Sequence, residues 1–329
     1  MADRHKRRKI TAFILVVVIS VIFLPTCSNG LENKNMETGE NDRLAVHYID
    51  VGEGDATLIR LPDGKVMLID TGEDSEENFN KISSYIDKYG KKIDYLILSH
   101  PDIEHYGCAK AIINKYEIGK VFIPRILNTA LYPEFFEVIS LIDKKEIERE
   151  ISRTYLSLST NDYALIFLSP DFDGKDSSYD EFNTSLMPNQ ILADDVSPII
   201  YLEYASIRFV FSADAGVKEE KRIITNYNLG LYKNVTINGW SANLSNVDFY
   251  KLSSHGGLGA NSYEFLSLLR PKNAVISVGG GNRNGNPATD VLIRLEEINR
   301  EYNLLRTDRD KTISVFVNNE GKTSITKGE

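Results

Sequence analysis

The chain is poor in cysteine, histidine and tryptophan, and each shortage limits what it can do. Its 329 residues include two cysteines, five histidines and one tryptophan. Two cysteines cannot build a disulfide framework, so a chain of this length must rely on a buried apolar core. Hydrophobic residues make up 42% and charged residues 26% of the chain, which is typical of a globular protein and excludes a disordered or fibrous one.

Basic residues are also too few to balance the acidic ones. The formal net charge is −9, from 38 Lys and Arg against 47 Asp and Glu. The first 26 residues hold five basic side chains and one acidic side chain, so the remainder is more acidic than the average. An acidic exterior argues against broad nonspecific binding of nucleic acid or anionic lipid.

Only one long apolar run is present in the sequence, at the N-terminus. Residues 10–24 are almost wholly apolar and follow a basic start, which is the pattern of a secretory signal over residues 1–26. The run is short for a membrane-spanning helix, which needs about 20 residues. Cys27 directly after the run resembles the acylated cysteine of a bacterial lipobox and predicts a lipoprotein, with a single N-terminal transmembrane anchor as the alternative. Both place the folded part on the extracellular face of the membrane.

The rest of the chain predicts one large domain. Residues 27–42 are polar and predict a flexible tether, residues 43–320 alternate strand and helix patterns of an α/β domain, and residues 321–329 predict a polar tail. A helix is expected over residues 132–150. The Asp-, Ser- and Asn-rich residues 171–195 predict a surface loop.

One loop after a buried strand has the composition of a metal site. In the sequence S-H-P-D-I-E-H at residues 99–105, His100, Asp102, Glu104 and His105 lie within six residues of one another. Imidazole and carboxylate groups together are typical metal ligands, and a polar loop whose Asp caps a helix is the alternative. Two of the four histidines that follow the signal share this loop, which favours a metal site.

Three further loops carry candidates. Asp214 follows one strand pattern and His255 follows another, but an isolated loop Asp or His often only caps or hydrogen-bonds. The Gly- and Asn-rich residues 279–287 allow close approach to a substrate. The polar candidates of that loop are Asn282, Arg283 and Asn286. Polar residues at the ends of neighbouring strands collect at one sheet edge, so these loops can converge.

Taken in order, these motifs resemble the metallo-β-lactamase superfamily, and within it the hydrolase domain of ComEC-type competence proteins and its stand-alone relatives. The resemblance spans residues 44–318. It is carried by V-H-Y-I-D-V-G-E-G-D-A at 46–56, by L-I-D-T-G at 68–72, by H-x-D-x-E-H at 100–105 and by R-T-D at 306–308. The resemblance implies a four-layer αββα sandwich with a two-metal site at one edge.

The resemblance also implies which residues hold two divalent ions, Zn²⁺ or Mn²⁺. Imidazoles and carboxylates are expected to contribute in two groups. The first ion would bind His100, Asp102 and Asp194, the second would bind Glu104, His105 and His255, and Asp214 would bridge both. Glu104 is one methylene longer than the family's Asp, and this length is expected either to shift the backbone or to weaken the second site.

Four carboxylates are given special roles by the same resemblance. Asp102 and Asp214 are the expected catalytic residues. Asp55 and Asp70 are expected to brace the ligand loop without touching the ions. The loop with Asn282, Arg283 and Asn286 is expected to face the substrate.

The implied activity is that of a surface-anchored, metal-dependent hydrolase that acts on phosphodiester bonds through a metal-bound hydroxide. Nucleic acid and a small phosphoester are both open as substrates, and no obligate protein partner is expected. A nuclease needs a basic track, for which only Lys251, Arg283 and Arg306 offer a local patch. Ser254 and Asn286 stand where the family carries histidines, so a non-catalytic or single-metal lipoprotein of the same fold is the alternative.

Overall fold

The computed structural model describes residues 42–126, 131–171 and 194–328. The predicted signal over residues 1–26, Cys27 and nearly all of the expected tether lie outside the described residues, as does most of the expected surface loop. Across the described ranges, no helix combines the length and the apolar character needed to cross a membrane.

Two β-sheets form the framework of the described chain. The first has the strand order β14-β13-β1-β2-β3-β4-β5-β6, and the second has the order β12-β11-β10-β9-β8-β7. The strands of the first sheet are β1 (Asp42–Tyr48), β2 (Thr57–Arg60), β3 (Val66–Ile69), β4 (Lys92–Ile97), β5 (Glu117–Ile123), β6 (Glu148–Ile151), β13 (Ile313–Asn318) and β14 (Thr323–Lys327). The strands of the second sheet are β7 (Tyr163–Phe167), β8 (Ile199–Tyr204), β9 (Ile207–Ser212), β10 (Phe249–Lys251), β11 (Asn273–Ile276) and β12 (Asn303–Arg306).

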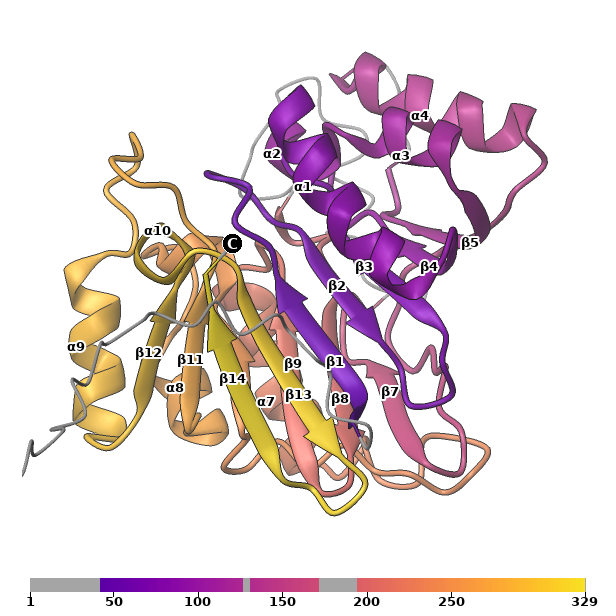
Figure 1. Ribbon diagram of the computed structural model, residues 1–329. Helices are drawn as coiled ribbons and strands as arrows, with labels where there is room; N and C mark the ends of the chain where they lie inside the picture. The colour runs from indigo at the N-terminus through magenta and orange to yellow at the C-terminus, as the bar shows by residue number, and fades with distance from the viewer. Residues whose placement is uncertain (1–41, 127–130, 172–193, 329) are drawn as a thin grey trace, which may run out of the picture. The chain divides into compact units, whose positions relative to one another are not determined.

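Helices flank the two sheets. Those of the N-terminal half are α1 (Glu76–Ile86), η1 (Asp87–Tyr89), α2 (Ile103–Tyr106), α3 (Ala109–Lys115) and α4 (Pro133–Lys144). Those of the C-terminal half are α7 (Val217–Asn228), η3 (Ser253–Gly256), α8 (Tyr263–Leu269), α9 (Thr289–Ile298) and α10 (Thr307–Asp310). Figure 1 shows β1, β13 and β14 of the first sheet in front of β8 and β9 of the second.

Apolar side chains hold the layers together. Alternate residues of β1, including Leu44 and Val46, are buried against residues of the second sheet such as Phe209 in one core between the sheets. The other face of the second sheet packs on α7, α8 and α9, for example through Ile223 and Phe265. With α1 and α3 over the first sheet, the result is the expected αββα sandwich, and this prediction is confirmed.

The strand directions bring the carboxyl ends of several strands to one edge of the sandwich, where a site can form. Strands β3 to β6 run parallel in the first sheet, and β9 to β12 run parallel in the second. Polar residues follow the carboxyl ends of four of them: Asp70 after β3, His100 after β4, Asp214 after β9 and His255 after β10. Carboxyl ends of parallel strands share an edge, where ligands of α/β proteins bind.

The predicted helix over residues 132–150 is wrong at its end. Helix α4 stops at Lys144, and Glu148–Ile151 forms strand β6, parallel to β5. Lys120 of β5 pairs with the carboxylates of Glu148 and Glu150 at 2.7 and 2.8 Å. An edge strand that is mostly exposed and charged has no apolar alternation, so its sequence gives no strand signal.

The predicted polar tail over residues 321–329 is also wrong. Thr323–Lys327 forms strand β14, which pairs antiparallel with β13 and forms one edge of the first sheet. The hairpin turns at Gly321, whose φ of 76° suits glycine. Four of the five β14 residues are exposed, so the strand is held by backbone pairing rather than by an apolar face.

One histidine of the first sheet should make stability depend on pH. His47 of β1 is 1% exposed and bonds through its two ring nitrogens to Ser314 and Tyr89, each at 2.7 Å. Burial, and then the charge of Lys88, lowers the pKa of His47 to about 3. The folded protein therefore keeps this imidazole neutral, whereas the unfolded chain protonates it below its usual pKa of 6.5.

The stabilising contribution of neutral His47 is complete above pH 6.5 and is lost as the pH falls from 6.5 toward 3. The loss is up to about 1.4 kcal/mol per pH unit. We expect His47→Gln to remove this part of the acid sensitivity, measured as the difference in urea unfolding free energy between pH 7 and pH 5. Ser314→Ala keeps the buried imidazole and should keep the wild-type slope. Equal slopes in wild type and His47→Gln would contradict the assignment.

Candidate metal centre

The loop between β4 and α2 is hydrogen-bonded to two other segments, the residues after β3 and the turn before β2. The amide of Thr71 donates to the carbonyl of His105 at 2.6 Å, and the amide of Asp55 donates to the carbonyl of Glu104 at 3.3 Å. Gly54 lies against the same carbonyl, and a Cβ at Gly54 would be 2.1 Å from the Glu104 oxygen. Only glycine allows this approach, which explains the G-E-G-D sequence of the turn.

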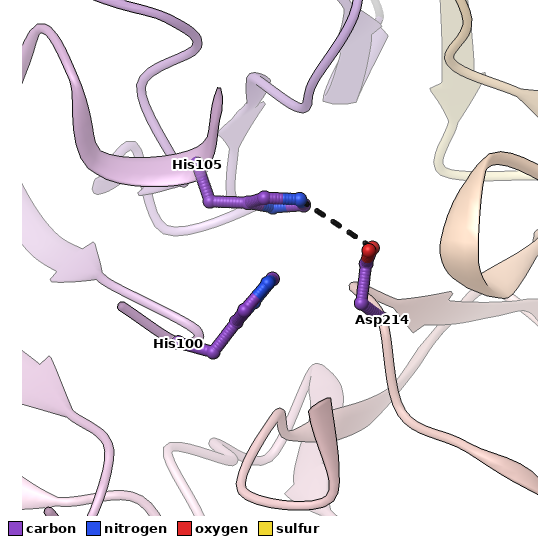
Figure 2. Close-up of side chains that lie close together, drawn as sticks. All are labelled: His100, His105 and Asp214. Carbon is purple, nitrogen blue, oxygen red and sulfur yellow. Dashed lines mark ion pairs between the residues drawn. The ribbon is translucent and has the colours of Figure 1, made fainter. Parts of the chain in front are cut away.

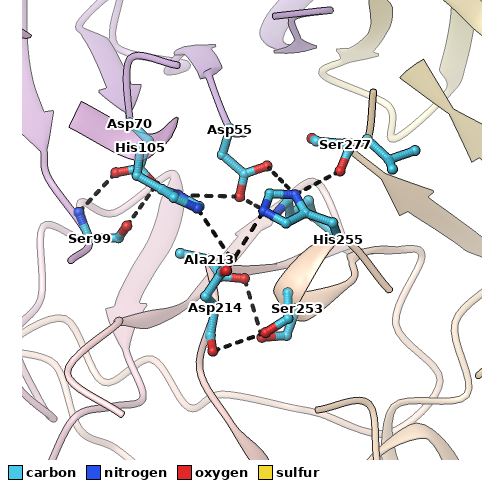
Figure 3. A network of polar contacts seen from close by, with 12 residues as sticks. Asp55, Asp70, Ser99, His105, Ala213, Asp214, Ser253, His255 and Ser277 are labelled. Carbon is cyan, nitrogen blue, oxygen red and sulfur yellow. Dashed lines mark hydrogen bonds and ion pairs between the residues drawn. The ribbon is translucent and has the colours of Figure 1, made fainter. Parts of the chain in front are cut away.

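Asp70 orients two of the candidate ligands from behind. Its carboxylate accepts hydrogen bonds from the amide and hydroxyl of Ser99 at 2.8 and 2.7 Å, and from Nδ1 of His105 at 2.9 Å (Figure 3). The Ser99 oxygen in turn accepts from Nδ1 of His100 at 3.0 Å. Because both Nδ1 atoms donate, Nε2 of each imidazole keeps its lone pair for a ligand in front. The bracing position expected for Asp70 therefore matches its contacts.

Four candidate ligands meet where the two sheets approach each other. Asp214, after β9, lies with Oδ1 at 3.5 Å from Nε2 of His105 and with Oδ2 at 3.7 Å from Nε2 of His255. The rings of His100 and His105 are 4.2 Å apart between centroids. Figure 2 shows His100, His105 and Asp214 directed toward one point. Asp214 thus lies between the imidazoles, as a bridging ligand requires.

The remaining candidates join this point in two groups. Ligand atoms of His100, Asp102 and Asp194 all lie within 4.8 Å of one another, as do those of Glu104, His105 and His255. These are the two groups that the resemblance implied. The extra methylene of Glu104 does not take its carboxylate out of reach of the second group.

The donor atoms of the centre suit cations. Five buried ligand atoms of the centre have no hydrogen-bond partner among the described residues: Nε2 of His100, His105 and His255, and Oδ1 of Asp194 and Asp214. Buried polar atoms are normally paired, and leaving each one unpaired costs about 1–3 kcal/mol. Lone pairs of imidazole and carboxylate that converge without hydrogen-bond donors fit divalent metal ions.

The ionisation of the groups reflects the same crowding. Burial opposes a charge on Asp214, yet the imidazoles of His105 and His255 hold the pKa of Asp214 well below its usual value. Burial also opposes a charge on His105, but the carboxylates of Asp214 and Asp70 raise its pKa well above the usual value. Burial, then Asp214 and Asp102, raises the pKa of Asp194 to about 8. The carboxylates therefore attract positive charge, which is what a metal ion supplies.

The expected basic patch is wrong for two of its three members. Lys251 is 2% exposed and donates to Asp55, which lies behind the second group of ligands. Arg306 is 9% exposed and forms a two-bond pair with Asp308, with its nitrogens at 2.9 and 2.7 Å from the carboxylate oxygens. Only Arg283 of the expected patch is exposed. Lys251 and Arg306, which were expected to contact a substrate, instead form ion pairs within the protein.

Asp55 holds a different position from Asp70. Its two oxygens lie 3.9 Å from Nδ1 of His105 and 4.0 Å from Nδ1 of His255, beyond hydrogen-bond distance. Burial raises the pKa of Asp55, but Lys251, His255 and His105 together more than offset this, so the net shift is downward. Asp55 therefore stays ionised and acts through its charge on the rings of His105 and His255, which lie on either side of it (Figure 3). Lys251 is its direct partner.

The predicted substrate loop lies against the turn that carries His255. The side chain of Asn286 donates to the carbonyl of Ser254 at 3.3 Å, and the side chain of Asn282 donates to the carbonyl of Asn286 at 2.7 Å. A Cβ at Gly256 would be 2.7 Å from Cβ of Pro287. Asn282 and Asn286 therefore shape the loop from within, and Arg283 is the member that faces outward.

Two contacts of the centre had little or no signal in the sequence. Nδ1 of His255 donates to the main-chain carbonyl of Ser277 at 2.9 Å. Every residue has such a carbonyl, so the sequence gives no sign of this contact. Lys251 was visible as a charge inside the apolar sequence F-Y-K-L, which indicates a buried partner rather than a surface role.

Comparison with known proteins agrees with this geometry. The family model described as the metallo-β-lactamase superfamily matches residues 49–280. The chain is 24% identical over 334 residues to ComE operon protein 3 of Bacillus subtilis (strain 168), covering 96% of this chain and 37% of the relative. It is 25% identical over 257 residues to Recombination protein 2 of Haemophilus influenzae, covering 76% of this chain and 26% of the relative. The chain thus spans well under half the length of both relatives.

Comparison with solved structures matches Igni18, a metallo hydrolase from Ignicoccus hospitalis, with 12% identity and a TM-score of 0.46 over 87% of this chain and 100% of the other. A variant of CmlA β-hydroxylase gives 12% identity and a TM-score of 0.49 over 80% of this chain and 52% of the other. The family match covers more than half of the chain and includes the His100 loop, Asp214 and His255. The chain belongs to the metallo-β-lactamase superfamily.

Proposed function

We propose that this protein is a metal-dependent hydrolase of phosphodiester bonds. The observation that carries the proposal is the meeting of unpartnered, buried imidazole and carboxylate atoms at one sheet edge. His100, Asp102 and Asp194 would hold one divalent ion, Glu104, His105 and His255 would hold another, and Asp214 would bridge them. Zn²⁺ and Mn²⁺ both suit this mixed nitrogen and oxygen set.

The residues around the centre have roles that follow from their contacts. A bound pair of divalent ions supplies Lewis acidity to a phosphoryl oxygen and lowers the pKa of water. Asp70 and Ser99 hold His105 and His100 in the tautomers that present Nε2 to the centre. The Ser277 carbonyl does the same for His255. The protein therefore arranges the ligands before a substrate arrives, which is the preorganisation that electrostatic catalysis needs.

Charge near the centre favours a small phosphodiester over a long nucleic acid. Lys251 and Arg306 are buried in ion pairs, which leaves Arg283 as the exposed cation of the predicted loop. Two of the exposed side chains near the centre are apolar rather than cationic: Ile103 in the ligand loop is 45% exposed, and Leu258 after the His255 turn is 57% exposed. A long polyanion needs many phosphate contacts, whereas a small diester needs only the ions and a local surface.

Hydrolysis is the first test. With added Mn²⁺ or Zn²⁺, the purified full chain should hydrolyse bis-p-nitrophenyl phosphate, because the substrate is small and needs no basic track. Asp214→Asn keeps the side-chain shape but removes the bridging charge, and it should lower kcat/KM by about 100-fold or more.

Asp248→Asn is the matched control for Asp214→Asn. Asp248 is also buried, but it pairs with Lys272 at the other end of β10, so its variant should retain activity. Metal-dependent turnover on neither small esters nor nucleic acid would overturn the proposed function. Faster turnover of nucleic acid than of small diesters would overturn the preference for a small substrate.

Metal stoichiometry separates a two-ion centre from the single-metal alternative. Wild type should bind two ions per chain. Glu104→Gln removes a charged donor of the second group, so one ion should bind about 10–100-fold more weakly in a metal titration while the other is retained. Glu104→Asp keeps the charge and should retain both ions. One ion or none in wild type would instead favour the non-catalytic or single-metal alternative.

We also propose that the domain is held at the outer surface of the membrane through Cys27. The basic start, the short apolar run and the position of the cysteine support this proposal. In cells given radiolabelled palmitate, wild type should incorporate label and Cys27→Ala should lose it. Equal labelling of both proteins, or none, would contradict acylation at this cysteine.

A further inference from the structure

The turn that carries His255 has an unfavourable backbone conformation. Ser254 and His255 have φ and ψ of 47° and 44° and of 53° and 27°, which place two consecutive non-glycine residues in the left-handed region. Such a residue is sterically strained and persists in this conformation only where its surroundings enforce it. The position of His255 in the centre therefore depends on what holds this turn.

Asn261 closes the turn from both ends. Its side-chain oxygen accepts from the amide of Ser253 at 3.2 Å and from the hydroxyl of Tyr250 at 3.1 Å. Its side-chain nitrogen donates to the carbonyls of Ser253 at 2.9 Å and Gly257 at 3.3 Å. The Asn261 side chain is fully buried and uses both acceptor and both donor positions of its amide. A single side chain thus spans the segment with His255 at its middle.

Asn261 is itself held by a buried carboxylate of α7. The amides of Asn261 and Ser262 donate to the two oxygens of Glu220, the second at 2.9 Å. Glu220 is fully buried, and Arg294 of α9 donates to the Asn261 carbonyl at 3.0 Å. Helix α7 begins at Val217, soon after Asp214, so Glu220 links the strand end that carries Asp214 to the turn that carries His255.

Further bonds join the same two segments. The hydroxyl of Ser253 donates to the carbonyl of Ala215 at 2.6 Å. It also lies 3.2 Å from the carbonyl of Ala213 (Figure 3). The amide of Ser254 donates to the same Ala213 carbonyl at 3.0 Å. These bonds set the base of the turn, but none of them reaches Gly257. The amide of Gly257 closes the turn within itself by donating to the carbonyl of Ser254 at 2.7 Å. The side-chain bonds of Asn261 reach the turn on both sides of His255 from outside it.

We infer that Asn261, anchored by Glu220, is a positioning residue that fixes the His255 turn and thereby sets the affinity of the ion served by Glu104, His105 and His255. The inference rests on the proposed function for the presence of that ion. Asn261 touches neither ion nor substrate. Its effect on the centre should therefore be confined to one half.

The test uses Asn261→Asp, which keeps the shape but replaces two donors by a carboxylate facing the carbonyls of Ser253 and Gly257. In Mn²⁺ titrations of the full chain, one ion should bind about 10–100-fold more weakly while the other keeps its wild-type affinity. Electron paramagnetic resonance should show the signal of coupled ions replaced by that of an isolated ion. Asn261→Ala should give the same selective loss without the added charge.

Asn299→Asp is the matched control. Asn299 donates to the carbonyl of Pro271 at 3.0 Å, at the end of β11 opposite to Ser277, so its variant should bind both ions as wild type does. Retention of both affinities in Asn261→Asp, or an equal loss of both, would overturn the inference.

Hydrogen exchange on the metal-free protein separates this inference from the proposed function. In Asn261→Asp, the amides of Ser254 and Gly257 should exchange at least about tenfold faster, while those of β8 and β9 should not change. Unchanged exchange at the turn would overturn the positioning role even if the wild type hydrolyses phosphodiesters. A wild type that binds metal but hydrolyses nothing would overturn the proposed function alone, and a wild type that binds no metal would overturn both.

Discussion

The concentration of negative charge at one edge of the sandwich constrains the rest of the structure. Asp55, Asp70 and Asp214 are nearly excluded from water and lie around His105. Carboxylates this close cannot all remain ionised without positive charge nearby. The chain supplies part of it through the Lys251 ammonium beside Asp55. The raised pKa of His105 shows that the same carboxylates draw a proton onto this imidazole, whose place at Nε2 a metal ion would take. Divalent ions bound in front of the imidazoles would supply the remainder.

This balance explains why the three imidazoles are held so differently from behind. Nδ1 of His105 donates to the carboxylate of Asp70, Nδ1 of His100 to the hydroxyl of Ser99, and Nδ1 of His255 to a main-chain carbonyl. A carboxylate partner raises the basicity of an imidazole more than a hydroxyl or a carbonyl does. His105, whose Nε2 lies 3.5 Å from Oδ1 of the bridging candidate Asp214, has the strongest of these partners. The arrangement therefore directs most negative charge to the middle of the centre.

The sequence predicted the candidate ligands better than it predicted the edges of the sheets. The candidate ligands follow buried apolar strands, whose pattern is clear, and the order of the strands then brings their ends together. Strands β6 and β14 have mostly exposed side chains, and they form because a neighbouring strand offers backbone partners. That information lies in the neighbour, so residues 148–151 and 323–327 carried no strand signal.

Long-range pairing also explains the errors and omissions around the centre. Lys251 was assigned to a surface patch, but its partner Asp55 lies 196 residues away in the sequence. Asn261 and Glu220 have ordinary sequence contexts, and their importance depends on bonds that cross a turn. Composition reveals that a charge or an amide needs a partner. Only the folded chain reveals which partner it has and which surface is left for a substrate.

Contacts of the His255 turn give a structural role to two departures from the family pattern, Ser254 and Asn286. The hydroxyl of Ser254 donates to the carbonyl of Asp214 at 3.2 Å, and the side-chain nitrogen of Asn286 donates to the carbonyl of Ser254 at 3.3 Å. Both residues stand where the resemblance has histidine, and both fasten the backbone beside His255. Neither side chain titrates near neutral pH, so neither can transfer protons there as an imidazole can. Where an imidazole could transfer a proton, these two side chains instead hold in place the backbone that presents His255 to the other candidate ligands.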